Sequence, residues 1–180
     1  ELPHYARKTT DLYFSYHFGE GELCSISDRG NYDLTNHNQH SGGKLKIKEP
    51  IPAVIEVSFG VERLILALLE DGYRQEIVEN SKGETTEREV LKLHPLLAPY
   101  FVAVIPWSKQ TQLRERACQI YQELLNETSF TTTYEESKWI GKSYHRQDAI
   151  GTYYCLTVDS QTLEDDTVTV RERDNLKQIR

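Results

Sequence analysis

Hydrophobic residues in the first half of the chain occur in short runs that are separated by polar segments. Residues 11–16 (DLYFSY) and 21–26 (GELCSI) have the aromatic and branched residues of short strands. Residues 28–48 are rich in asparagine, glycine, histidine and serine, which predicts loops with room for one short helix. Residues 53–58 (AVIEVS) are then expected to form a third strand.

A helix is expected directly after that third strand. Its apolar residues follow the i, i+3, i+4, i+7, i+8 spacing of one helical face: Val61, Leu64, Ile65, Leu68 and Leu69. The pattern predicts an amphipathic helix over residues 61–70 that buries its leucine and isoleucine side.

The middle of the chain is polar and then becomes strongly apolar. Residues 79–89 (ENSKGETTERE) are charged and contain a glycine, which is typical of an exposed connector. Pro95 and Pro99 discourage a long helix in the next segment. We expect a second unit to begin at Tyr100, because the apolar run 100–106 (YFVAVIP) predicts a strand that is buried on both faces.

Helical and strand-like patterns alternate in this second unit. An amphipathic helix is expected at 110–128, followed by a β-rich run at 130–136. A further helix is expected at 140–151, and strands at 152–159 and 167–174. This alternation predicts a mixed or parallel sheet covered by helices, so the fold class is mixed α/β (α+β).

Composition limits the class of protein. The 180 residues fit one large domain or two small ones, with 38% hydrophobic residues and a mean hydropathy of −0.61. No apolar run approaches the roughly 20 residues that cross a membrane, and the start does not resemble a signal peptide, so we expect a cytoplasmic protein without a membrane partner. Three widely spaced cysteines indicate reduced thiols. The lack of methionine and the initial glutamate indicate a piece of a longer protein or a product of processing. A net charge of −7 argues against nonspecific nucleic-acid binding by a basic surface.

The candidate chemistry lies where the third strand meets the helix. A strand that runs through Ser58 and Gly60 into a helix brings backbone close to a ligand, and the helix N-terminus favours an anion. Arg63 adds a planar donor fork suited to phosphate. Glu56 projects from the same strand face as Ser58, so an acid and a hydroxyl lie side by side. A strand-to-helix packing turn with a surface arginine is the alternative explanation of the same pattern.

Residues 55–70 (IEVSFGVERLILALLE) resemble the third signature motif of class II aminoacyl-tRNA synthetases, in particular glycyl-tRNA synthetase of the bacterial and eukaryotic homodimeric type. Further family motifs follow one another in order: HYARKT, GELCSISDRGNYDL, NQHSGGKL, EREVLKLHPLLAP, IGKSYHRQDAIGTYYCLTVD and TLEDDTVTVRERD. Each is weak alone, but together they cover nearly the whole chain. The resemblance implies that residues 1–95 are the C-terminal part of the catalytic domain, an antiparallel sheet with helices. Residues 96–180 would be a mixed-sheet anticodon-binding domain.

The activity that the resemblance implies is ATP-dependent ligation of glycine to its tRNA through glycyl-adenylate (glycine–tRNA ligase). ATP would be a substrate and Mg²⁺ would be held by its phosphates and an acid such as Glu22 or Glu56. The implied catalytic residues are Arg63 and Glu56. The implied ATP-binding residues are Glu22, Leu23, Gly60, Val61, Glu62 and Arg63. The implied glycine-binding residues are Glu56, Val57, Ser58, Phe59 and Gly60.

Some positions depart from the family pattern. Val57 replaces a proline and Glu62 replaces an aspartate, which puts the exclusion of larger amino acids in doubt. The family's first two motifs would lie before Glu1. We therefore expect the chain alone to be an inactive fragment of an enzyme that is a homodimer at full length.

The functional assignment of other polar and aromatic residues is weaker. His37 and His40 invite a metal, but no acid or cysteine completes a ligand set, so no metal site is firmly assigned. Tyr144, Arg146, Gln147 and Asp148 could stack on and read unpaired anticodon bases, although a solvated helix face is the commoner explanation. From Leu96 onward, 10 Lys and Arg stand against 12 Asp and Glu, so base contacts must contribute much of any tRNA selectivity. Trp107 and Trp139 are candidate stackers, with packing as the alternative.

Two other functions are open on sequence alone. The anticodon-binding fold also occurs in noncatalytic modules, such as the accessory subunit of the mitochondrial DNA polymerase. The second alternative is a regulatory paralogue that binds tRNA or an amino acid but does not attach one to the other. The combination of Glu56, Ser58, Gly60 and Arg63 argues for the enzyme.

Overall fold

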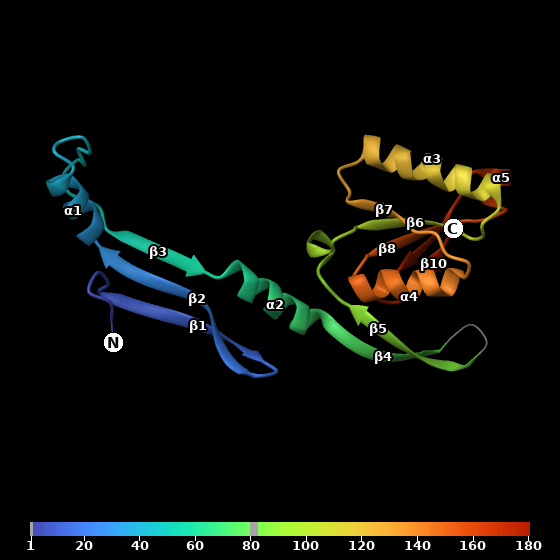
Figure 1. The fold of residues 1–180 in the computed structure, drawn as a ribbon, viewed down its shortest axis with the longest axis horizontal. Coiled ribbons are helices and arrows are strands. Elements are labelled where there is room, and N and C mark those ends of the chain that lie inside the picture. Colours follow the sequence, from blue (N-terminus) through green and yellow to red (C-terminus); the bar gives the residue numbers. More distant parts are fainter. Residues whose placement is uncertain (1, 80–82) are drawn as a thin grey trace. The chain divides into compact units, whose positions relative to one another are not determined.

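The protein is described by a computed structural model that covers residues 2–79 and 83–180. Its internal contacts divide it into a first unit, residues 1–70, and a second unit, residues 71–180 (Figure 1). This division is earlier than the domain boundary expected after residue 95. The division at residue 70 reflects contacts within the folded chain, whereas the boundary at residue 95 was inferred from the family resemblance. The two boundaries need not coincide, and the boundary at 95 stays a prediction.

A three-stranded antiparallel sheet forms most of the first unit, in the order β1-β2-β3. The elements, in chain order, are β1 (Lys8–Tyr16), β2 (Gly19–Gly30), α1 (Tyr32–His40), β3 (Val54–Phe59) and α2 (Val61–Gly72). The three expected strands and the helix are confirmed. β2 runs four residues beyond the predicted end at Ile26, because pairing with β1 and β3 on its two sides holds Asp28 in the sheet.

The register gathers polar side chains on one face of this sheet. Ser25 lies opposite Asp11 and Ser58, and Ser27 lies opposite Thr9 and Glu56. Directly paired residues of antiparallel strands point to the same side. Ser25 Oγ donates to Asp11 Oδ1 at 2.7 Å, which confirms this for the first pair. The first unit therefore has one polar sheet face.

An irregularity in the pairing brings Glu22 to that polar face. The register of β1 and β2 shifts between Leu12 and Tyr13, so that Tyr13 pairs with Glu22. Tyr13 follows Asp11 by two residues in β1 and therefore shares its face. Glu22, Glu56 and Ser58 thus project from one side of the sheet.

The burial expected for α2 is wrong. The helix is present with its predicted spacing, but Ile65 is 51% exposed and Leu69 is 41% exposed, while Ala67 is buried at 5%. Periodicity reports which side of a helix is apolar and not whether another element covers it. In the described structure most of that side is uncovered.

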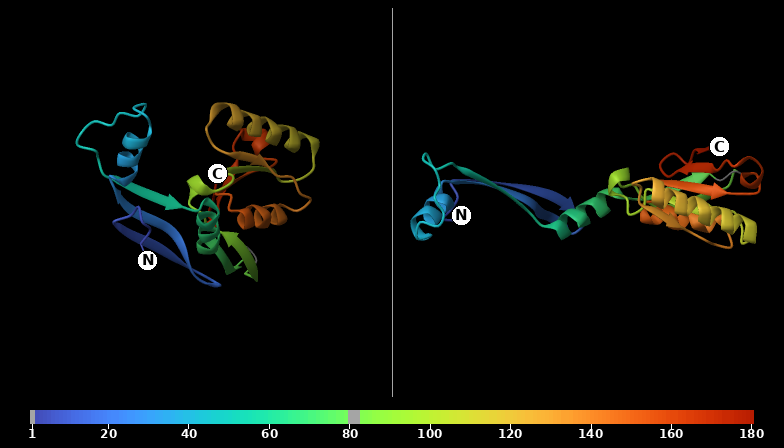
Figure 2. Two further views of the ribbon diagram at one scale, coloured as in Figure 1. Left: turned by 60° about the vertical axis from the view of Figure 1, so that its left-hand side comes forward. Right: turned by 90° about the horizontal axis from the view of Figure 1, so that it is seen from above.

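A five-stranded mixed sheet organises the second unit, in the order β10-β9-β8-β6-β7. β6 is parallel to β7 and β8, whereas β9 is antiparallel to β8 and β10. α3 covers one face and α4 the other (Figure 1 and Figure 2). The elements are η1 (Pro95–Leu97), β6 (Val102–Pro106), α3 (Thr111–Glu127), β7 (Thr132–Tyr134), α4 (Ile140–Ile150), β8 (Tyr154–Val158), α5 (Thr162–Asp165), β9 (Thr169–Glu172) and β10 (Gln178–Ile179).

The core of the second unit lies on both sides of β6, as its apolar sequence predicts. Val104 packs with Leu113 and Ala117 beneath α3. Ala103 and Ile105 point to the opposite face and pack against residues of α4. The predicted strand buried on both faces is therefore confirmed, and so is the mixed α+β fold class.

Residues 79–89 were expected to be an exposed connector. The exposure is confirmed for the described residues of this segment except Arg88, but most of them lie in strands, so the expected connector is wrong. β4 (Tyr73–Glu79) and β5 (Thr85–Leu91) pair as an antiparallel two-stranded sheet, and residues 80–82 lie outside the described part. Arg88 and Val90 are only 2% and 1% exposed, because every second residue of β5 faces the rest of the unit. The high charge of this segment concealed that alternation.

Arginine side chains join this hairpin to the sheet. Arg173, in the turn after β9, donates from Nη2 to the carbonyl oxygen of Leu93 at 2.7 Å and from Nη1 to those of Leu91 and Gly151. Arg88 donates from Nη1 to the Arg173 carbonyl oxygen at 2.9 Å. The hairpin is thus part of the second unit. No helix within residues 2–79 and 83–180 is long and apolar enough to span a membrane.

Candidate functional site

The transition from β3 into α2 places the predicted catalytic residues. Glu56 and Ser58 are two residues apart in β3 and project from the polar sheet face. The helix begins at once, with Leu64 N–H donating to the Gly60 carbonyl at 3.0 Å. Arg63 lies in its first turn, so the strand and the helix set its position relative to Glu56.

Both the backbone and the side chain of Arg63 are tied to the β1–β2 hairpin. The Tyr16 hydroxyl donates to the Arg63 carbonyl oxygen at 3.0 Å, and Arg63 Nη1 donates to the Glu22 carbonyl oxygen at 2.8 Å. The Arg63 side chain also passes over Gly60, whose missing Cβ would lie 3.6 Å from Arg63 Cγ. Among the described residues, Arg63 Nε and Nη2 make no further hydrogen bond, so these donors are available to a ligand.

A second contact holds α2 against the hairpin within the first unit. The backbone N–H of His17 donates to Glu70 Oε2 at 2.9 Å, and His17 Nδ1 lies 2.6 Å from Glu70 Oε1. Burial acts to raise the pKa of the Glu70 carboxyl, but the His17 hydrogen bonds outweigh it and the pKa falls below its usual value. The β1–β2 hairpin thus contacts α2 both at Arg63, in its first turn, and at Glu70, near its end.

Arg29, which was not among the predicted site residues, forms an ion pair with Glu56 of the predicted glycine-binding residues. Its Nη1 donates to Glu56 Oε2 at 2.5 Å, and its Nε and Nη2 donate to the two Asp33 oxygens. The Asp33 bonds, then that of Glu56, raise the pKa of Arg29, and Arg29 lowers the pKa of Asp33. The spacing of Arg29 and Asp33 in the motif SDRGNYDL was a usable signal. Residues 28–48 were expected to form loops with room for one short helix, and α1 is that helix.

The remaining predicted residues of this site occupy different surroundings. Val57 and Phe59 alternate with Glu56 and Ser58, so they point to the opposite sheet face, where they are 58% and 55% exposed. Leu23 lies at the pairing irregularity of β2. Val61 and Glu62 are exposed in the first turn of α2. Their roles in binding ATP and glycine stay predictions.

The four residues predicted to contact the anticodon separate into two pairs on α4. Asp148 and Gln147 are 1% and 3% exposed. Asp148 accepts two 2.8 Å hydrogen bonds from Arg171, and Gln147 Oε1 accepts one from Thr152 at 2.6 Å. Asp148 thus joins α4 to β9, and Gln147 bonds to the segment that follows the helix. The expectation of a solvated helix face is wrong for both residues.

Tyr144 and Arg146, the other pair, are more accessible. Tyr144 is half-buried, and burial raises its pKa although its hydroxyl bonds to Thr157 Oγ1 at 2.6 Å. Arg146 is exposed and pairs with Glu135. The assignment of all four residues to anticodon binding stays a prediction.

Two exposed tryptophans lie near the carboxyl ends of the parallel strands. Trp107 directly follows β6 and is 55% exposed, while Trp139 directly precedes α4 and is 60% exposed. Of their alternative role, packing in the core or at its rim, the core part is therefore wrong and the rim part stays open. Ligands of α/β sheets commonly bind at this edge of the sheet.

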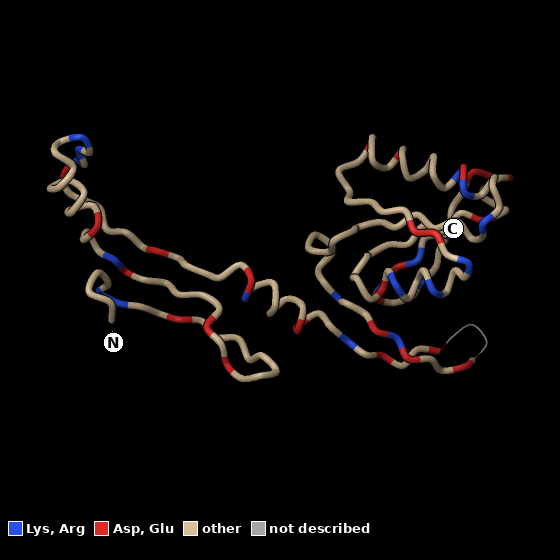
Figure 3. The backbone as a smooth tube through the Cα atoms, viewed as in Figure 1, with Lys and Arg blue, Asp and Glu red and all other residues tan. Residues whose placement is uncertain are grey.

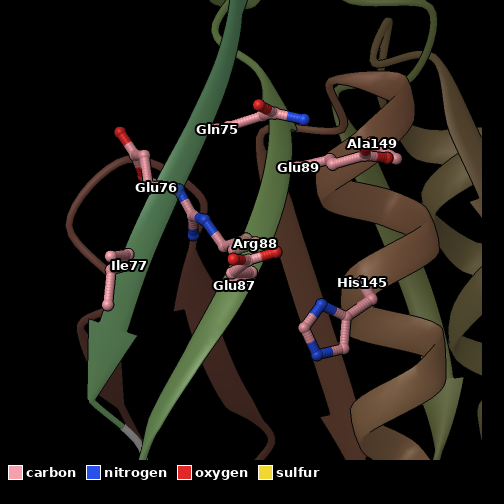
Figure 4. Close-up of a pocket in the computed structure, with 8 residues that line it drawn as sticks. All are labelled: Gln75, Glu76, Ile77, Glu87, Arg88, Glu89, His145 and Ala149. Carbon is pink, nitrogen blue, oxygen red and sulfur yellow. Dashed lines mark hydrogen bonds and ion pairs between the residues drawn. The ribbon is translucent and has the colours of Figure 1, made fainter.

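A hollow of about 420 Å³ lies between the β4–β5 hairpin and α4, and Figure 4 shows the residues around it. His145 reaches from α4 toward β5, while Gln75 and Glu89 are paired across the hairpin. Basic and acidic residues are interleaved along both elements (Figure 3). No group of three potential metal ligands occurs within residues 2–79 and 83–180.

Comparisons with solved structures identify the fold. The RNA binding domain of threonyl-tRNA synthetase from Cryptosporidium parvum Iowa II matches with a TM-score of 0.63 and 18% identity, over 95% of this chain and 39% of that chain. Giardia lamblia prolyl-tRNA synthetase in complex with prolyl-adenylate matches with a TM-score of 0.63 and 16% identity, over 97% of this chain and 35% of that chain. At these identities the likeness concerns the fold alone.

Sequence comparisons are more specific. Residues 101–180 match the family described as "Anticodon binding domain". Over the whole chain, the glycine–tRNA ligase of Mycoplasmopsis synoviae is 47% identical and that of Clostridium perfringens is 45% identical. The chain spans about 40% of the length of these curated relatives. The resemblance drawn from the motifs is thus confirmed: the chain is similar to glycine–tRNA ligases along its whole length, and its residues 101–180 match an anticodon-binding domain.

Proposed function

We propose that the chain contributes ATP, glycine and anticodon contacts to a glycine–tRNA ligase. The observation that carries this proposal is the arrangement of Glu56, Ser58 and Arg63, with two acceptors on a polar sheet face and free guanidinium donors at the start of the next helix. The 47% identity to a glycine–tRNA ligase supports it. The activity itself belongs to the full-length gene product, in the cytoplasm and as a homodimer.

Arg63 would bind a terminal phosphate of ATP. Its Nη1 bond to the Glu22 carbonyl fixes the guanidinium, which leaves Nε and Nη2 to donate to phosphate oxygens. A guanidinium at that point offsets charge that develops when the glycine carboxylate attacks the α-phosphorus and pyrophosphate leaves. No side-chain nucleophile is required, because the carboxylate of glycine is the nucleophile.

Mg²⁺ fits this site only together with ATP. The described residues hold no ready set of three ligands, so phosphate oxygens would supply most of the coordination, and Glu22 on the polar sheet face would be an additional acid ligand. Glu56 is less suited, since its Oε2 already accepts from Arg29. The ion would add positive charge at the phosphates.

Glycine would be held by its ammonium group. Glu56 supplies the negative charge and Ser58 a hydroxyl acceptor on the same face of β3. Arg29 is a positioning residue in this scheme, because its bonds to Glu56 and Asp33 fix the direction of the Glu56 carboxylate. Val57 and Phe59, on the other face, would contribute backbone groups.

The second unit would bind the tRNA through unpaired bases. Trp107, Trp139 and the exposed part of Tyr144 offer rings on which bases can stack, and Arg146 offers a cation. From Leu96 to the end, 10 basic residues stand against 12 acidic ones, so attraction to phosphates alone does not account for binding.

Aminoacylation of a glycine tRNA transcript with labelled glycine tests the proposal. We expect the full-length gene product to charge this transcript, and Glu56→Gln to raise the KM for glycine at least tenfold, because the ammonium group loses its counter-charge. Glu115→Gln, on the exposed side of α3, is the matched control. Charging that is unaffected by Glu56→Gln would contradict the proposed glycine site.

A further inference from the structure

The ring of Tyr16, the last residue of β1, is held by three neighbours in the β1–β2 hairpin. Tyr16 is 6% exposed, and its ring stacks on the Phe18 ring with the centroids 5.0 Å apart. The Phe14 ring packs against it edge-on, at a centroid distance of 4.8 Å. Gly21 leaves room for the ring, because a Cβ at that position would lie 2.8 Å from Tyr16 Cε2. The hairpin therefore sets the direction of the Tyr16 hydroxyl.

This hydroxyl reaches the first turn of α2. It donates to the Arg63 carbonyl oxygen at 3.0 Å, and both residues belong to the first unit. A carbonyl oxygen has two lone pairs, so the Arg63 oxygen can accept from Tyr16 and also from an N–H of its own helix. Loss of the hydroxyl therefore leaves no orphaned carbonyl, and we expect its cost in stability to be small.

A second contact keeps α2 joined to the hairpin when the hydroxyl is absent. Glu70 accepts from the backbone N–H of His17 at 2.9 Å, and His17 directly follows Tyr16. Arg63 and Glu70 are seven residues apart, so they lie on the same side of the helix. The Glu70 contact holds the later turns of α2, which leaves the Tyr16 bond to hold the backbone of the first turn.

The backbone position matters because the Arg63 guanidinium has a single fixed point. Among the described residues, its one hydrogen bond runs from Nη1 to the Glu22 carbonyl oxygen at 2.8 Å. A planar group that is held at one nitrogen can still pivot about that bond. The direction in which Nε and Nη2 point therefore depends on where the helix places the Arg63 backbone. An error of about 1 Å in the placement of such a group can cost about a hundredfold in rate.

We propose that Tyr16 is a positioning residue: its hydroxyl holds the Arg63 backbone so that Nε and Nη2 of Arg63 point toward a phosphate of ATP. The inference rests on the proposed function, in which Arg63 binds that phosphate. Tyr16 itself needs no contact with ATP, because it acts through the arginine. It lies 47 residues before Arg63 and was not among the residues predicted to bind ATP.

Tyr16→Phe removes the hydroxyl but keeps the buried ring. Glycine-dependent ATP–pyrophosphate exchange by the full-length gene product gives kcat and the KM for each substrate. We expect kcat/KM for ATP to fall by about tenfold, within the hundredfold that misplacement can cost. The KM for glycine and the stability in urea should stay unchanged, since the proposed glycine contacts come from β3. A merely structural role would instead alter the stability and the KM for both substrates.

Two further comparisons sharpen this test. Tyr73→Phe is the matched control, because it also removes a tyrosine hydroxyl that donates a hydrogen bond, to Glu89 Oε1 at 3.2 Å, but it lies in the second unit. Neither KM should change in this control. Tyr16→Phe should also cost almost nothing further when it is combined with Arg63→Lys, because lysine has no guanidinium fork for Tyr16 to direct.

Three outcomes would overturn the inference, and they have different meanings. If Arg63→Lys impairs exchange but Tyr16→Phe behaves as the parent protein does, Tyr16 does not position Arg63 and the proposed ATP site stands. If Tyr16→Phe causes the same loss with Arg63 and with Lys at position 63, its effect does not pass through the guanidinium. If the full-length parent protein shows no exchange at all, the proposed function fails and the inference fails with it.

Discussion

At the scale of single residues, Arg63 is held in place by groups that are distant in sequence. The Tyr16 hydroxyl donates to the Arg63 carbonyl oxygen, and the Glu22 backbone carbonyl accepts from the Arg63 guanidinium. Strands β1 and β2 thus fix the first turn of α2. The arginine can then present its remaining donors without losing much conformational freedom.

Arg63→Lys tests the importance of the planar guanidinium. Lysine keeps the charge but lacks the planar fork whose separate nitrogens bond to the Glu22 carbonyl and to phosphate, so we expect kcat/KM for ATP in the full-length gene product to fall by about 10²–10³-fold. Glycine-dependent ATP–pyrophosphate exchange measures it. Arg74→Lys, on the exposed side of β4, should change nothing, and equal activity of the two variants would contradict the assignment.

Asp148 has a structural role that its motif did not reveal. Its carboxylate is 1% exposed and accepts from Arg171 and Arg88. Removal of its charge leaves two buried guanidinium groups without a common partner, so we expect Asp148→Asn to lower the free energy of unfolding by about 3–5 kcal/mol. Urea denaturation followed by tryptophan fluorescence reports on the second unit, because Trp107 and Trp139 both lie there. The exposed Asp71→Asn control should change stability by less than about 0.5 kcal/mol.

Asp159 gives the second unit a defined acid sensitivity. The hydrogen bond from Arg180 is the main cause that lowers the pKa of Asp159 from 3.8 to about 2. Because the folded-state pKa is the lower one, the stabilisation is complete above about pH 4 and is lost as the pH falls toward 2.

Arg180→Gln tests this pH dependence. We expect the variant to be less stable than the parent chain by about 1 kcal/mol at pH 6, after allowance for solvent screening, and the difference to vanish near pH 2. Urea denaturation at a series of pH values measures it. A difference that grows as the pH falls would contradict the assigned ion pair.

At the scale of elements, periodicity predicted what is local and missed what depends on distant partners. The spacing of apolar residues placed α2 and α3, and the unbroken apolar run placed β6. β5 was missed because a charged residue such as Arg88 is normally expected at the surface. Here Arg88 faces inward because it pairs with Glu76 and Asp148, which are distant in sequence. The same limitation hid the Arg29–Glu56 contact, since it joins β2 to a strand 27 residues later.

The apolar face of α3 is buried, whereas that of α2 is largely exposed, and substitutions in the two helices should differ in their cost to stability. Leu113 is 2% exposed in α3, so Leu113→Ala should cost about 2–5 kcal/mol of unfolding free energy. Ile65 is 51% exposed in α2, so Ile65→Gln should cost less than about 0.5 kcal/mol in this chain. Urea denaturation followed by circular dichroism compares the two. A large cost at Ile65 would show that the exposed side of α2 is covered in solution.

At the scale of the whole molecule, the two units divide the proposed work. The first unit has the polar sheet face, Arg29 and Arg63, and the second unit has the exposed tryptophans and α4. Ile55, Val57, Phe59 and Ile65 leave exposed apolar surface on the first unit, which is typical of a surface that another part of a protein covers. The chain spans about 40% of its curated relatives, so we propose that catalysis requires the rest of such a protein.

Glycine-dependent ATP–pyrophosphate exchange tests the central claim most directly, when it is measured on this chain and on the full-length gene product side by side. We predict exchange with the full-length product and little or none with the 180-residue chain, because the chain would supply only part of the ATP and glycine contacts. Absence of exchange in a well-folded full-length product would contradict the ligase assignment and favour a noncatalytic RNA-binding module.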